Sequence, residues 1–205
     1  MKIDFLTIEA IYDHEITEKK SRFIAYIAPA ITKHEAEEFF SLIRTRHRDA
    51  RHNVPAYRIG VENIEEWCND DGEPSGTAGK PMLELLRSAE LTNVALMVTR
   101  YFGGTLLGTG GLVRAYGGVV SMLIDKIPVI KKQLYKRMFV EVDYKNIGKI
   151  KRVLDEQGIF IGMECAQNVV VTYDIKYDKR ELAKSALTEI CAGQVVIMEG
   201  DNIYI

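Results

Sequence analysis

The sequence has few cysteines, and their spacing suggests neither a disulfide framework nor a shared metal site. Cys68, Cys165 and Cys191 are odd in number and lie far apart in a chain of 205 residues. No Cys-x-x-Cys pair and no Cys/His spacing of the zinc-binding kind occurs. We therefore expect free thiols in a reducing compartment, and neither a disulfide framework nor a bound metal.

Long apolar runs are also missing. A membrane-spanning helix needs about 18 to 20 apolar residues in succession, and every apolar run here is far shorter. The first twenty residues, MKIDFLTIEAIYDHEITEKK, interrupt their apolar positions with acids, unlike the core of a signal peptide. The sequence therefore predicts a cytoplasmic protein that does not bind membranes.

An excess of charge of one sign is absent too. The chain has 27 Lys and Arg against 29 Asp and Glu, and an apolar fraction of 47% that is typical of a folded protein. Residues 1–130 carry 15 basic and 18 acidic side chains, and residues 131–205 carry 12 and 11. This balance argues against a protein that coats nucleic acid through an overall positive charge, so contact with RNA would need a local basic patch.

The hydrophobic pattern predicts an α+β protein with two domains, residues 1–130 and 135–205. In the first domain we expect strands at 5–16, 22–28, 54–61, 64–69 and 93–101, and helices at 33–47, from about Thr77 or Gly79 to Ala89, and at 112–126. Thr32 and Glu35 have the spacing of a capping box at the start of the first helix. The second domain reads as β-α-β-β-α-β, the ferredoxin-like order.

Turn-forming and polar residues are concentrated in DDGEPSGTAGKP, residues 70–81. A phosphate-binding loop of the Gly-x4-Gly-Lys-Ser/Thr type does not fit. Pro74 stands where its first glycine should be, and Pro81 stands where a magnesium-binding hydroxyl should follow Lys80. Another explanation for this loop is required.

A second glycine-rich loop, FGGTLLGTGG at residues 102–111, connects an apolar strand to a helix. Unpaired N–H groups at the start of that helix would favour an anion, although a tight structural turn explains the glycines equally well. Val113 breaks the Gly-x-Gly-x-x-Gly pattern. Gly117 and Gly118 lie inside the helix, and we attribute them to a close approach of the helix to the sheet.

Two arginines flank this second loop. Arg114 at a helix N-terminus opposes the helix dipole and calls for an acid or an anionic ligand. Arg100 and Arg114 therefore either bind acids of the 70–81 loop and clamp the loops together, or contribute to an anion site. His52 is a possible proton shuttle, with a hydrogen-bonding turn residue as the alternative.

Four stretches together carry a family resemblance. KSRFIA (20–25), RHNVPAYRIG (51–60), DDGEPSGTAGKP (70–81) and TRYFGGTLLGTGGLVRAY (99–116) resemble, in order, the motifs of the IMPACT/YigZ family. The resemblance implies a first domain of the ribosomal-protein type also found in elongation factor G domain four, with a left-handed βαβ crossover. It also implies a ferredoxin-like second domain similar to a domain of elongation factor G.

The resemblance further implies a role in translation and in the response to stress. Eukaryotic relatives regulate a starvation-responsive kinase and bind its large activator protein through an additional N-terminal domain. Because the motif region of this chain starts at Lys20, we carry over only the motif surface, not a partner or a reaction. We expect RNA, a ribosome or a translation protein as partner, with no preference for DNA.

The expected anion-binding residues come from all four stretches: Lys20, Arg22, His52, Arg58, Lys80, Arg100, Tyr101, Gly103, Gly104, Gly108, Gly110, Gly111 and Arg114. The expected loop clamp consists of Asp70, Asp71, Glu73, Ser75 and Thr77. No catalytic residue, metal or cofactor is expected.

Two alternatives remain at this point. The first is an enzyme that holds a phosphorylated small molecule at the glycine loop. Asp70 and Asp71 could then bind a metal, although neighbouring residues on an extended segment point in opposite directions. The second is a protein-interaction module anchored by Tyr101 and Phe102.

Overall fold

The computed structural model describes residues 2–205 and divides into two compact units. One unit runs from Phe5 to Lys131, and the other joins the described residues up to Asp4 to the segment from Lys132 to Ile205. Residues 2–4 therefore group with the C-terminal part, not with the expected 1–130 domain. One reason is a backbone hydrogen bond in which the Leu134 N–H donates to the Ile3 carbonyl at 2.8 Å.

The N-terminal unit is built on five strands in the order β2-β3-β6-β4-β5, each antiparallel to its neighbours. Their bounds are β2 Tyr12–Glu18, β3 Ser21–Pro29, β4 His52–Ile59, β5 Glu65–Cys68 and β6 Val94–Tyr101. β6 is buried along nearly its whole length, which confirms that the apolar run NVALMVTRY is a central strand. β3 and β4 both pair with β6, so the segment between them crosses from one strand to a parallel one.

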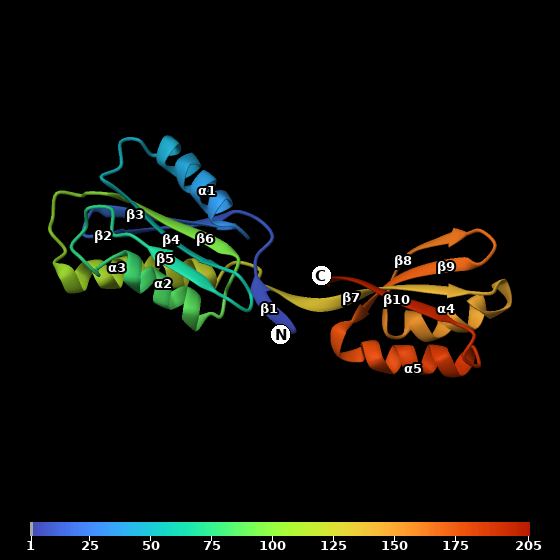
Figure 1. The fold of residues 1–205 in the computed structure, drawn as a ribbon. Coiled ribbons are helices and arrows are strands. Elements are labelled where there is room, and N and C mark those ends of the chain that lie inside the picture. Colours follow the sequence, from blue (N-terminus) through green and yellow to red (C-terminus); the bar gives the residue numbers. More distant parts are fainter. Residues whose placement is uncertain (1) are drawn as a thin grey trace. The chain divides into compact units, whose positions relative to one another are not determined.

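Helices cover both faces of this sheet (Figure 1). α1 (Lys33–Arg46) packs on one face, and α2 (Gly79–Ser88) and α3 (Thr109–Ile124) pack on the other. The predicted capping box of α1 is confirmed, because the Thr32 hydroxyl accepts from the Glu35 N–H at 3.2 Å and the Glu35 carboxylate accepts from the Ile31 N–H at 2.8 Å. Successive side chains of a strand point to opposite faces of the sheet, so they alternate between the core under α1 and the core under α2 and α3.

Three local predictions were wrong. The strand expected over 5–16 is two strands, β1 (Asp4–Thr7) and β2. Neither Thr77 nor Gly79 caps α2, whose N-cap is Ala78, without a side-chain cap of its own. The glycines inside α3 do not mark a close approach: a Cβ on Gly118 would meet nothing within 4 Å, and one on Gly117 only Leu85 at 3.9 Å.

The C-terminal unit confirms the ferredoxin-like order. Its elements are β7 Ile130–Val142, the 3₁₀ turn Tyr144–Asn146, α4 Ile147–Asp155, β8 Gly158–Cys165, β9 Val169–Lys176, the 3₁₀ turn Tyr177–Lys179, α5 Arg180–Ile190 and β10 Val196–Tyr204. β7 pairs with β9 and β10 and β9 pairs with β8, which gives the strand order β10-β7-β9-β8. α4 and α5 lie on one face and share a core with the sheet (Figure 1).

No helix within residues 2–205 is both long and apolar enough to cross a membrane.

Candidate functional site

Asp70 organises the loop that follows β5. One of its carboxylate oxygens accepts from the backbone N–H groups of Ala78 at 3.1 Å and Gly79 at 2.9 Å, and the other accepts from Gly76 at 2.8 Å. The free N–H groups at the start of α2 are thus satisfied by an acid eight residues upstream. Asp70 is a structural residue that closes its own loop.

Asp71 ties the same loop to the start of β4. Its carboxylate accepts from the Asn53 N–H at 2.6 Å, and its carbonyl oxygen accepts from Nδ1 of His52 at 2.7 Å. A carbonyl oxygen only accepts, so His52 carries its proton on Nδ1. Asp70 and Asp71 therefore have different partners, and both carboxylates accept hydrogen bonds from backbone N–H groups.

Glu73 lies at the centre of a buried polar cluster. Oε1 accepts from Arg100 Nη1 at 2.6 Å and from the Tyr116 hydroxyl at 2.9 Å, and it lies 3.7 Å from Nε2 of His52. Burial, followed by the charge of Glu73, raises the pKa of Tyr116 far above its usual range, so this phenol stays protonated. The cluster joins the 70–81 loop to β6 and α3.

A pocket of about 420 Å³ opens beside this cluster. It is lined by Arg51, His52, Glu73, Pro74, Arg100, Phe102, Leu106, Leu107, Gly108, Thr109 and Leu112. Residues from both glycine-rich loops therefore line one cavity. The Arg100 side chain is almost fully buried, and its Nε has no hydrogen-bond partner among the described residues.

The α3 N-terminus forms part of the pocket wall. Its N-cap is Gly108, with φ of 71°, and the first turn contains neither a side-chain cap nor an acid. Arg114 folds back over this turn, since a Cβ on Gly110 would lie 3.8 Å from Arg114 Nη1. Unpaired N–H groups and a guanidinium thus gather at one end of the helix.

The glycine loop packs tightly on the β2–β3 turn. A Cβ on Gly103 would lie 2.0 Å from the carbonyl carbon of Lys20 and 2.4 Å from the backbone nitrogen of Ser21. Gly103 also donates its N–H to the Ser21 hydroxyl at 3.2 Å. Lys20, with φ of 67°, is therefore held beside the loop, and Gly103 is required by this close approach.

Other expected site residues lie elsewhere. Arg22 pairs in register with Tyr101, whereas Phe23 pairs with Arg100. Alternation along the strands therefore puts Arg22 and Tyr101 on the α1 face and Arg100 on the opposite face. Arg22 binds Glu15 through two hydrogen bonds of 2.6 and 2.7 Å.

Arg58 lies away from the loop pocket. It lies six residues from His52 along β4, about 20 Å away in an extended strand, where it donates to Glu66 at 2.8 Å and to the Leu91 carbonyl at 2.7 Å. Lys80 is exposed on the first turn of α2 and does not line the pocket.

The remaining residues of the expected set lie in the loops or in the first turn of α3. Ser75 is exposed, and the Thr77 hydroxyl donates to the Pro74 carbonyl at 2.6 Å. Gly104, with φ of 83°, needs the conformational freedom of glycine. Gly111 lies in the first turn of α3, where an added Cβ would lie 3.0 Å from Cβ of Leu107.

Sequence reasoning missed several pocket residues. Arg51 lies inside the motif RHNVPAYRIG but was not among the expected site residues, and its guanidinium lies 5.7 Å from the centre of the Phe102 ring. Leu106, 83% exposed, stands at the rim. An apolar residue exposed in a glycine-rich loop was the available signal.

The described residues 2–205 contain no group of three or more His, Cys, Asp or Glu side chains arranged for a metal ion.

Comparison with known proteins gives consistent matches. The Impact N-terminal domain family matches residues 19–124. "IMPACT family member YvyE" of Bacillus subtilis is 39% identical over 202 residues, which cover 98% of this chain and 93% of the relative. An "IMPACT family member" of Haemophilus influenzae is 36% identical over 193 residues, 91% of each chain. A crystal structure described as a hypothetical protein matches 98% of this chain and 99% of its own, at 30% identity and a TM-score of 0.67.

Proposed function

The chain belongs to the IMPACT family, and from that premise we propose that it is a translation-associated binding protein that holds the phosphate backbone of RNA in the pocket between its two glycine-rich loops. The observation that carries this proposal is Arg100, which lines the pocket and has a buried Nε without a partner. An unsatisfied guanidinium N–H is costly in a dry site, and a phosphate oxygen would satisfy it.

The start of α3 supports an anionic ligand independently. The first N–H groups of a helix have no partner within it, and together they carry about half a positive charge. In α3 no acid or capping side chain neutralises them. Gly108 and Gly110 present bare backbone there, which lets a phosphate approach the N–H groups closely.

The charge balance sets the expected strength of binding. Glu73 neutralises Arg100, so the remaining positive charge comes from the exposed Arg51 of the lining and from Arg114, which lies beside the first turn of α3 outside the lining. Few phosphates can be neutralised by so few cations, so affinity should be modest and should fall with salt. Contacts to phosphates position a strand without reading its bases, so we expect little sequence preference.

The translational setting is supported by the family resemblance of the four motif stretches, three of which contribute to this pocket or to the loops around it. We therefore expect ribosomal RNA, or RNA bound to a translation factor, as the physiological ligand.

A second candidate function is supported by the size of the pocket. A cavity of about 420 Å³ falls within the range of about 300–1,000 Å³ that holds small molecules. An enzyme or receptor for a phosphorylated metabolite would use the same α3 N-terminus, with the His52 imidazole on the pocket wall.

The test compares binding of a fluorescent single-stranded RNA and of purified ribosomes at several salt concentrations. Arg51→Ala and Arg114→Ala should weaken binding about equally for different RNA sequences, and each should lower the slope of log affinity against log salt by about one. Arg100→Lys keeps a charge for Glu73 but removes Nε, and it should weaken binding as well.

Arg48→Ala serves as the matched control, since Arg48 is exposed in the same unit and does not line the pocket. Thermal unfolding of every variant separates lost binding from lost folding. If folded Arg51 and Arg114 variants bind RNA and ribosomes like the parent, the RNA proposal fails. Saturable binding of inorganic phosphate or pyrophosphate in that case would favour the small-molecule function.

A further inference from the structure

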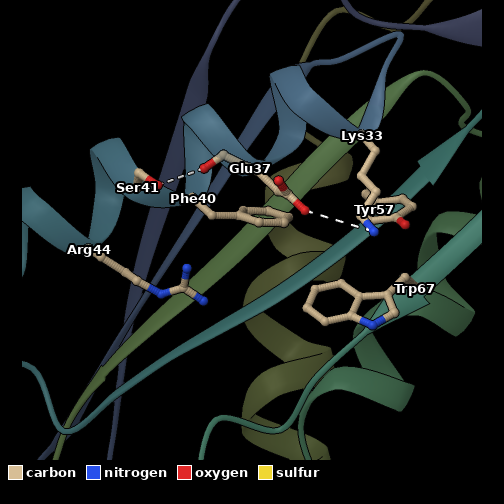
Figure 2. A pocket seen from close by; sticks show the side chains of 7 residues that line it. All are labelled: Lys33, Glu37, Phe40, Ser41, Arg44, Tyr57 and Trp67. Carbon is tan, nitrogen blue, oxygen red and sulfur yellow. Dashed lines mark hydrogen bonds and ion pairs between the residues drawn. The ribbon is translucent and has the colours of Figure 1, made fainter.

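A second hollow, of about 410 Å³, lies on the α1 face of the N-terminal sheet (Figure 2). It is lined by Lys33, Glu37, Phe40, Ser41 and Arg44 of α1, Tyr57 of β4 and Trp67 of β5. Its residues are distinct from those of the loop pocket. Tyr57 lies five residues along β4 from His52, about 17 Å in an extended strand.

Packed aromatic rings form one side of this hollow. Trp67 stands opposite Tyr57 in the β4–β5 register, and their rings stack with centroids 5.7 Å apart and planes inclined by 26°. Phe40 contacts the same indole, at 6.4 Å between centroids. Tyr57 and Phe40 are each 2% exposed, whereas Trp67 is 42% exposed. An indole packed against two buried rings is therefore partly exposed to solvent.

Tyr57 adds no charge to the hollow. Its hydroxyl donates to Glu65 at 2.5 Å, and burial, together with this hydrogen bond, raises the pKa of Tyr57 to about 12. The phenol is therefore protonated at physiological pH.

Two cations, Lys33 and Arg44, stand at the rim of the hollow. Lys33 lies 3.9 Å from Glu37, a distance at which an exposed pair is weak. Arg44 has no ion-pair partner among residues 2–205. Lys33 and Arg44 are eleven residues, about three turns, apart and so lie on one stripe of α1, with about 16 Å of rise between them. Figure 2 shows their side chains reaching down from the helix on two sides of the hollow.

From this arrangement we propose that the hollow binds a short single-stranded nucleic-acid segment, with one base stacked on Trp67 and the adjoining phosphates held by Arg44 and Lys33. Flat aromatic surface flanked by cations is the combination that single strands recognise, because every base has a face that stacks. The separation of Lys33 and Arg44 along α1 suits well-spaced phosphates of a strand that runs past Trp67 better than the compact charge of one mononucleotide.

Other ligands fit the same residues less well. A quaternary ammonium group needs several exposed ring faces without nearby cations, but here one ring is exposed between a lysine and an arginine. A purely apolar side chain would cover the indole and leave the Arg44 charge unused. This inference goes beyond the loop pocket and does not depend on it.

Trp67 is the only tryptophan in the sequence, which makes it a local probe. Titration with a hexamer of adenylate should quench its fluorescence in a saturable way, and adenosine monophosphate should bind more weakly. Arg44→Ala should raise the dissociation constant for the hexamer several-fold. Trp67→Leu, followed through a labelled hexamer, should weaken this binding by about five-fold to a hundred-fold, the range expected for one stacked base.

Three comparisons separate this site from the loop pocket. Arg48→Ala, outside both sites, should leave quenching unchanged. Arg51→Ala combined with Arg114→Ala should preserve quenching even where total RNA binding falls. The proposal is overturned if the hexamer does not quench Trp67, or if quenching by the Arg44→Ala variant matches the parent. Equal affinity for the monophosphate and the hexamer would overturn the assignment of a strand in favour of a free nucleotide.

Discussion

Arg100 and Glu73 form an ion pair inside the N-terminal unit, with 2.6 Å between Nη1 and Oε1 and side-chain exposures of only 6% and 3%. The pair joins β6 to a loop 27 residues earlier in the chain. Removing one member leaves the other charged and buried, which is far more costly than removing both.

We therefore expect Glu73→Ala to lower the free energy of unfolding by about 3–5 kcal/mol. Glu73 also accepts from Tyr116, whose hydroxyl would lose its partner. The double variant Glu73→Ala with Arg100→Met should recover a large part of the loss, as measured by urea unfolding. A double variant as unstable as the sum of the two single variants would show that the pair is not energetically coupled.

Asp70 should matter for the stability of the loop and of α2. Asp70→Ala leaves three backbone N–H groups without their acceptor, and we expect a loss of about 2 kcal/mol or more. Asp70→Asn keeps one oxygen and should lose less. Glu84→Ala, an exposed acid on the same helix, is the matched control and should change stability by less than about 0.5 kcal/mol. Equal losses for Asp70→Ala and Glu84→Ala would contradict the capping role.

Gly103 and Gly118 should respond in opposite ways to alanine. A Cβ on Gly103 overlaps the Lys20 backbone, so Gly103→Ala should cost about 3 kcal/mol or more and disturb the glycine loop. Gly118 is helical and has open space, so Gly118→Ala should stabilise the protein by about 0.5–1 kcal/mol. Thermal unfolding of the two variants measures the sign of each change in stability. A Gly103→Ala protein as stable as the parent would rule out the close approach.

His47 should make the N-terminal unit sensitive to mild acid. Its Nε2 lies 2.8 Å from the Tyr26 hydroxyl and its Nδ1 lies 2.8 Å from the Tyr101 hydroxyl. Burial, and then the positive charges of Arg46 and Arg22, lower the pKa of His47 below the ordinary 6.5. Because the unfolded chain takes up a proton first, stability is full above pH 6.5 and falls as the pH drops through the lowered native pKa.

The measurement is the urea midpoint as a function of pH from 7.5 to 5. His47→Gln should flatten the acid side of this curve, whereas the exposed His34→Gln should not. Parent and His47→Gln proteins with the same pH dependence would mean that His47 does not contribute to it.

The sequence by itself determined features that depend on local pattern. The capping box at Thr32, the central strand NVALMVTRY and the β-α-β-β-α-β order of the second unit each follow from side chains close together in the chain. The motif stretches also indicated the family. Periodicity, capping and composition are short-range properties, so a single sequence contains them in full.

Only the tertiary structure decided which side chains meet. Arg100 and Tyr101 were expected to act together, but a strand turns alternate side chains to opposite faces, so Arg100 enters the polar cluster while Tyr101 faces α1. Asp70 caps a helix that begins nine residues later. Trp67 lines a hollow together with residues of α1, which lie more than twenty residues earlier in the chain. Such contacts depend on strand register and on the close approach of loops, as at Gly103 and Lys20, and these are properties of the packed sheet rather than of any one segment.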